Sequence, residues 1–194
     1  MNMLFPVLIS CALLLPACMP RSPETHYYVL DARPGDAPAG TPLSGRTPVR
    51  LDRISLPDYL DRGGIVCRGA DGVTLNVAEF HVWAEPLKNG VRRALTETLA
   101  PRLERAGHVL LHQDDDGGLR IAVDVLRFEG VQGGAVLDAQ FSIEQDGHAP
   151  VREHRAYSES CGENIGDLVQ AQSRLLRLLA TDMAEAVLKT SARR

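Results

Sequence analysis

The side chains that could transfer protons or bind a metal are spaced in ways that do not favour catalysis. His108 and His112 lie four residues apart on a predicted strand, which separates them by about 13 Å and prevents both from binding one ion. The acidic run 114–116 precedes two glycines and is typical of a turn. Glu79 and Glu85 could form an acid–base pair, but neither a nucleophile nor an oxyanion site accompanies them. We therefore expect no catalytic residues, no metal site and no cofactor.

The common catalytic and nucleotide-binding motifs are absent from the sequence. It contains no Gly-x-Gly-x-x-Gly, no Walker loop, no Gly-x-Ser-x-Gly and no His-Glu-x-x-His. Its glycine-containing turns are simple Asp-Gly turns instead. The net charge is −4 and no block of Lys or Arg occurs, which argues against nucleic acid as a partner.

The N-terminal residues carry the clearest chemical signal. The run from Leu4 to Ala17 is uncharged, too short to span a bilayer comfortably, and typical of the apolar region of a signal peptide. It ends in the sequence Leu-Pro-Ala-Cys, which resembles a bacterial lipobox whose cysteine, Cys18, receives diacylglycerol. We predict a lipoprotein signal peptide at 1–17 and a lipidated tether at 18–25; an ordinary secretory signal with an incidental thiol is the alternative. Met19 follows Cys18, and by the sorting rule that this resemblance implies the protein goes to the outer membrane.

Two further cysteines, Cys67 and Cys161, each end a predicted strand. The periplasm permits disulfides, so a bridge between them is possible. Two separate thiols, one of them buried, are the alternative.

The remaining chain, 26–194, has the length and the 44% hydrophobic content of one globular domain. Alternating apolar residues predict half-buried strands, and apolar stripes predict one helix beginning after Pro86 and another beginning at the cap Asn164. Pro101 predicts a kink or an early end of the first helix near Leu99. Three successive strands, at 119–125, 135–143 and 151–160, are expected to form an antiparallel meander. We expect an α+β fold in which two amphipathic helices pack on one face of an antiparallel-rich sheet. A flexible loop is predicted at about 32–48, where proline and glycine are frequent.

Two local features of the predicted strands can be stated in advance. The apolar positions change phase between Leu51 and Ile54, which predicts a bulge or a twist. Asp71 and Gly72 predict a hairpin turn, and the alternation of Val73, Leu75 and Val77 predicts that the strand after it buries one face.

The aromatic residues gather in the stretch 54–87, which contains the only tryptophan. We hypothesise that exposed residues of this stretch form a contact surface for a partner or for neighbouring copies, because Tyr and Arg are frequent interface anchors. The candidates are Pro57, Tyr59, Leu60, Arg62, Phe80 and Trp83. A structural role is the alternative: we favour the core beneath the first helix for Phe80 and Trp83, and weigh the two roles equally for Tyr59.

Several segments together resemble the PqiC/YmbA family of ABC-type transport auxiliary lipoproteins. The segments are Tyr27–Leu30, Leu56–Arg62, Ile65–Val66, Ala78–Leu87 and Val123–Gly130. Their order and spacing agree with the family over essentially the whole mature chain.

The resemblance implies an outer-membrane lipoprotein that faces the periplasm and has no enzymatic activity. It implies partnership with an MCE-domain tunnel protein and inner-membrane transporter components that move lipids between the membranes, with possible assembly into homo-oligomeric rings. The alternatives are a lipoprotein that itself carries a lipid, or a structural envelope lipoprotein that binds peptidoglycan.

Overall fold

The computed structural model describes residues 23–31, 46–111 and 118–192, which form a mixed sheet and two long helices. In chain order the elements are β1 (His26–Tyr28), β2 (Thr47–Ser55), η1 (Asp58–Leu60), β3 (Gly64–Arg68), β4 (Leu75–Trp83), α2 (Leu87–Arg105), β5 (His108–Leu111), β6 (Leu119–Val131), β7 (Gly134–Glu144), β8 (Val151–Ser160) and α3 (Ile165–Ser191). The predicted α+β class with two helices is confirmed.

Strand β6 organises the sheet. It pairs with β2 on one side and β7 on the other, while β5 and β8 form the two outer edges. The predicted antiparallel meander β6–β7–β8 is confirmed, but β2 runs parallel to both β5 and β6, so the sheet is mixed. Parallel neighbours need a crossover connection, and α2 provides it between β2 and β5.

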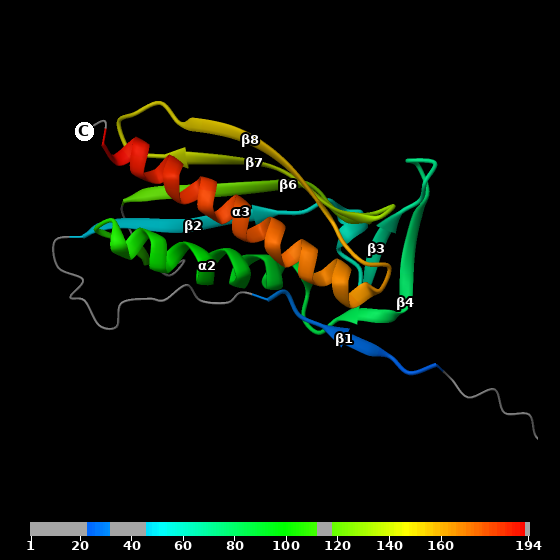
Figure 1. Cartoon of the computed structure of the whole chain (residues 1–194). Helices are drawn as coiled ribbons and strands as arrows, with labels where there is room; N and C mark the ends of the chain where they lie inside the picture. The colour runs from blue at the N-terminus through cyan, green and yellow to red at the C-terminus, as the bar shows by residue number, and fades with distance from the viewer. Residues whose placement is uncertain (1–22, 32–45, 112–117, 193–194) are drawn as a thin grey trace, which may run out of the picture.

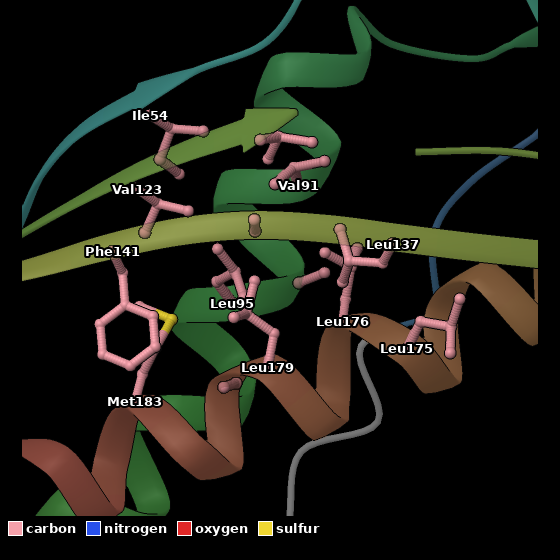
Figure 2. Packing of buried hydrophobic residues seen from close by; sticks show 14 of the residues in the cluster. Ile54, Val91, Leu95, Val123, Leu137, Phe141, Leu175, Leu176, Leu179 and Met183 are labelled. Atoms are coloured by element: carbon pink, nitrogen blue, oxygen red, sulfur yellow. The ribbon is translucent and has the colours of Figure 1, made fainter. Parts of the chain in front are cut away.

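The two helices pack against the same face of this sheet and against each other (Figure 1). Figure 2 shows the resulting core, in which Phe141 from the sheet meets Met183 of α3 and Leu95 of α2 lies close by. All three side chains are buried. None of the described helices is long and apolar enough to cross a bilayer.

Helix α2 continues past the residue that was expected to end it. Pro101 predicted a kink or an early end of the helix near Leu99. The early end is wrong, because α2 runs unbroken to Arg105 with Pro101 inside it. Proline in a helix interior costs about 3 kcal/mol. The last turn offsets part of this cost because it buries Leu103 completely, a contribution of about 2 kcal/mol.

Local signals elsewhere are confirmed. Asn164 caps α3, since its side chain accepts a hydrogen bond from the backbone N–H of Asp167 at 2.8 Å. The predicted bulge in β2 appears as a register shift between Leu51 and Arg53. Arg92 of α2 donates to the carbonyl of Leu51 there at 2.7 Å. The predicted loop at 32–48 extends two residues too far, because β2 begins at Thr47, and residues 32–45 lie outside the described residues.

Strands β3, β4 and β1 form a separate part of the sheet, which we call the arm. It joins the main sheet through one pair, Cys67 of β3 and Gly130 of β6. The predicted hairpin turn is confirmed, with Gly72 at φ +73° and Asp71 accepting from the N–H of Thr74 at 2.9 Å. The predicted buried face after this turn is wrong, because Val73 is 81% exposed. No helix covers the arm there (Figure 1).

Candidate interaction surface

The turn 57–62 connects β2 to β3 and is anchored from within. Its backbone closes through a bond from the N–H of Leu60 to the carbonyl of Pro57 at 2.9 Å. Leu60 is only 1% exposed and belongs to the core, so its predicted place in a contact surface is wrong. Arg62, at the end of the turn, is exposed and remains available for contact.

Tyr59 points toward a carboxylate that sequence reasoning did not single out. Its hydroxyl donates to Oε2 of Glu129 at 2.8 Å, and Glu129 is 0% exposed. Arg68 donates to both oxygens of Glu129, at 2.5 and 3.1 Å, and Arg127 donates to Oε1 at 3.0 and 3.1 Å. We call these four residues the Glu129 cluster. It joins the turn, β3 and β6 through one buried charge.

Hydrogen bonding decides the ionisation of this cluster. Burial alone would raise the pKa of Glu129, but the hydrogen bonds from Arg68, Tyr59 and Arg127 outweigh it and hold the pKa below its ordinary value. Burial, with the bond to Glu129, raises the pKa of Tyr59 to about 12. The carboxylate is therefore charged and the phenol protonated at neutral pH. This satisfied network fits a structural role for Tyr59, which was one of the two roles weighed for it.

A signal for Glu129 existed in the sequence. Apolar residues alternate from Leu119 to Val125, and Phe128 then falls out of phase with them. This change marks the register shift between Val125 and Arg127, which turns Glu129 to the face away from the helices.

Phe80 and Trp83 differ in their surroundings. Trp83 packs against the core. Its backbone N–H donates to the carbonyl of Gly63 at 2.8 Å, so the end of β4 lies beside the turn and next to Arg62. Phe80 is 38% exposed, so the favoured place for it in the core is wrong. The physical reason is that β4 is bordered by the short β1, and its outer side carries no helix.

Cys67 and Cys161 are both free thiols, and both line one cavity of about 410 Å³ beneath the start of α3. Burial raises the pKa of each thiol, and for Cys67 the neighbouring Cys161 adds to the effect. The two lie close enough to interact electrostatically, and the bridge between them stays a prediction.

Two of the residues considered for proton transfer or metal binding have other partners. Glu85 binds Arg93 of α2 at 2.7 Å, and His108 is buried with its Nδ1 3.0 Å from the carbonyl of Ala106. Within 23–31, 46–111 and 118–192, no group of three His, Cys, Asp or Glu side chains could hold a metal. His112 and the acidic run 114–116 lie outside the described residues.

The helix-free face of the main sheet contains a shallow hollow of about 570 Å³ lined mainly by polar side chains. Some of its charges pair with one another: Arg53 lies 3.3 Å from Asp124, and Arg120 lies 3.8 Å from Glu144. These pairs are typical of a hydrated sheet face rather than of a reaction centre.

Known proteins resemble this chain in both sequence and fold. The sequence matches the family described as ABC-type transport auxiliary lipoprotein component over residues 28–184. The fold is similar to that of an uncharacterised protein of known crystal structure, at 21% identity and a TM-score of 0.71, covering 85% of this chain and 99% of that one. It is also similar to a protein from Xanthomonas campestris, at 15% identity and a TM-score of 0.66, covering 87% and 98%. No curated protein matches significantly.

Proposed function

The chain belongs to the ABC-type transport auxiliary lipoprotein family, and from this premise we propose that it is the non-enzymatic outer-membrane accessory of an intermembrane lipid transport system built on an MCE-domain protein. The observation that carries the proposal is the extent of the family match, which runs from β1 to within α3. The family name itself implies association with an ABC transporter.

Anchoring in the membrane follows from the N-terminal sequence. In this proposal residues 1–17 are removed and Cys18 carries the lipid. Residues 18–25 then tether the domain that begins at His26. Met19 beside the lipidated cysteine directs the protein to the outer membrane. Replacing residues 1–18 with an ordinary cleavable secretory signal is expected to move the protein from the membrane fraction to the soluble periplasmic fraction, and membrane retention of that mature protein would contradict this anchoring.

We assign the partner contact to the turn 57–62, with Arg62 as its accessible side chain. Pro57 stiffens the turn, and buried Leu60 and hydrogen-bonded Tyr59 fix it from below. A rigid turn loses little conformational entropy on binding, so an exposed arginine on it is well suited to anchor a partner protein. The alternative partner for this turn is a neighbouring copy of the same chain in a ring.

The experiment is photocrosslinking in membranes with a photoreactive residue at Arg62, followed by mass spectrometry. The matched control carries the same residue at Arg152, an exposed arginine on edge strand β8. Capture of an MCE-domain protein from position 62 and not from 152 supports the proposal. Capture of this chain alone would make the turn a ring interface. Capture of nothing by a folded protein would overturn the assigned contact.

A further inference from the structure

One side of the strand pair β1–β4 carries two histidines, a tyrosine and the tryptophan. His26 pairs with His81 and Tyr28 with Trp83, so these four side chains share one side of the pair. The two imidazole rings stack at 5.3 Å, and the Tyr28 hydroxyl lies 2.8 Å from Nδ1 of His81. Tyr28 and Trp83 pack against the core, which identifies this side as the inner one.

The outer side of the same pair is apolar. Tyr27 pairs with Val82, so these two share the outer side, and exposed Phe80 lies two residues before Val82 on the same strand. Val29 follows Tyr27 at the same spacing. Tyr27 is 70% exposed, Val29 56% and Phe80 38%. We call Tyr27, Val29, Phe80 and Val82 the outer face; none of its side chains is charged.

An exposed apolar side departs from the usual arrangement, in which the apolar side of a strand faces the core and the polar side faces water. Exposed apolar groups that gather on one face mark a surface that contacts something other than water. Because no basic side chain belongs to the outer face, attraction to anionic groups does not account for it.

The distance to the lipid anchor indicates what covers the outer face. Eight residue steps separate Cys18 from His26, and a fully extended chain of that length reaches at most about 29 Å. Tyr27 is one residue further along. The acyl chains therefore hold the outer face within a short distance of the bilayer. The C-terminal end of α3 lies at the opposite end of the molecule (Figure 1).

We propose that the outer face rests in the interfacial layer of the membrane that holds the lipid on Cys18, a step that depends on the lipidation in the proposed function. The apolar side chains of Tyr27, Val29 and Phe80 enter the boundary between headgroups and acyl chains, and the phenol of Tyr27 stays at headgroup level. The contact fixes the orientation of the domain on the membrane, which a flexible tether alone would not do.

The test uses fluorescence from a single tryptophan. Trp83 is the only one in the chain, so a Trp83→Phe background has none. On that background, Phe80→Trp places the probe on the outer face, and Leu188→Trp places it near the C-terminal end of α3, at a site of similar exposure, 36% against 38%. Each full-length lipidated protein is reconstituted into phosphatidylcholine vesicles with and without bromine on the acyl chains, and flotation confirms anchoring.

Brominated lipid is expected to remove about half of the fluorescence of the Phe80→Trp protein and almost none from the Leu188→Trp protein, because quenching needs close contact and the interfacial layer is about 5–10 Å deep. The result should not change when anionic phosphatidylglycerol is added. Equal quenching at both sites, or none at Phe80→Trp in protein that floats with the vesicles, would overturn the inference and leave the anchoring intact. Protein that does not float would overturn the anchoring and this inference with it.

Iodide quenching in detergent-free buffer tests whether something other than the membrane covers the outer face. The unlipidated protein, made with the ordinary secretory signal in place of residues 1–18, is measured without any membrane. Iodide is expected to quench the fluorescence of its Phe80→Trp side chain. Protection from iodide at low protein concentration would show that another part of this chain covers the face. Protection that appears only as concentration rises would show a second copy. Either result would overturn the membrane contact.

Discussion

Tyr59 donates a hydrogen bond of 2.8 Å to Glu129, a carboxylate that no solvent reaches. The two residues are 70 positions apart in the chain, and the bond joins the turn before β3 to the middle of the sheet. Because Arg68 and Arg127 bind the same carboxylate, the position of the turn depends on one buried negative charge.

Replacing Glu129 with Gln should lower the free energy of unfolding by about 3 kcal/mol. The change removes the charge and leaves two guanidinium groups facing a neutral amide, and breaking a buried pair from one side typically costs 3–5 kcal/mol. Urea denaturation followed by circular dichroism measures the loss. Glu144→Gln, on the helix-free face, is the control and should change stability by less than about 0.5 kcal/mol. Equal losses of unfolding free energy for the two changes would show that the Glu129 cluster contributes no more to stability than an exposed carboxylate does.

Acid should weaken the protein through the same carboxylate. The pKa of Glu129 in the folded state lies below its ordinary value of 4.5, so its contribution to stability is fully present above pH 4.5 and is lost as the pH falls through the folded value. Unfolding free energies measured from pH 6 downward should therefore differ by a constant amount above pH 4.5 and begin to converge between the natural protein and Glu129→Gln only below it. A difference that stays constant below pH 4.5 as well would contradict the lowered pKa.

Substitutions at two residues of the turn should affect different properties, one the stability of the fold and the other the contact with the partner. Tyr59→Phe should lower the free energy of unfolding by about 1–2 kcal/mol, because Glu129 loses a donor. Arg62→Ala should leave the melting temperature nearly unchanged and weaken capture of the partner, since Arg62 is exposed. Differential scanning calorimetry and the membrane pull-down together test this, and a large drop in melting temperature for Arg62→Ala would assign the arginine a structural role.

The phenol of Tyr59 should make the stability of the protein depend on pH in the alkaline range as well. Its pKa rises from 10.0 to about 12 in the folded state, so its contribution is present below pH 10 and is lost as the pH rises through about 12. The stability difference between the natural protein and Tyr59→Phe should shrink over that interval. Tyr157, whose pKa is also raised by burial and by Asp182, is unchanged in both proteins and cancels from the comparison.

Pro101→Ala should stabilise α2. The substitution restores a backbone N–H to the helix interior, and the gain of up to about 3 kcal/mol exceeds the small loss of buried ring atoms. Thermal unfolding of the variant measures the change. The control is Pro57→Ala, at the start of η1, where φ is already −60° and the proline should help. A lower melting temperature for Pro101→Ala would show that packing of the buried ring outweighs the missing hydrogen bond.

The features that depend on neighbouring residues could be predicted from the sequence. The Asp71–Gly72 turn, the Asn164 cap and the bulge after Leu51 rest on backbone preferences that act over a few positions, and all three are present. The two helices and the meander β6–β7–β8 followed from apolar spacing, since each element needs one face buried. The family was also readable, because its motifs lie in short contiguous segments.

Which strands and helices lie side by side depends on contacts between distant parts of the chain. Alternation shows that a strand has a buried face but not which strand lies beside it, so the parallel position of β2 between β5 and β6 was not predictable. The same limit applies to Glu129, whose partners come from two other elements, and to Phe80, which was placed in the core. Its exposure depends on the arm extending beyond the helices, and that is a matter of how distant segments pack rather than of any pattern in the residues around it.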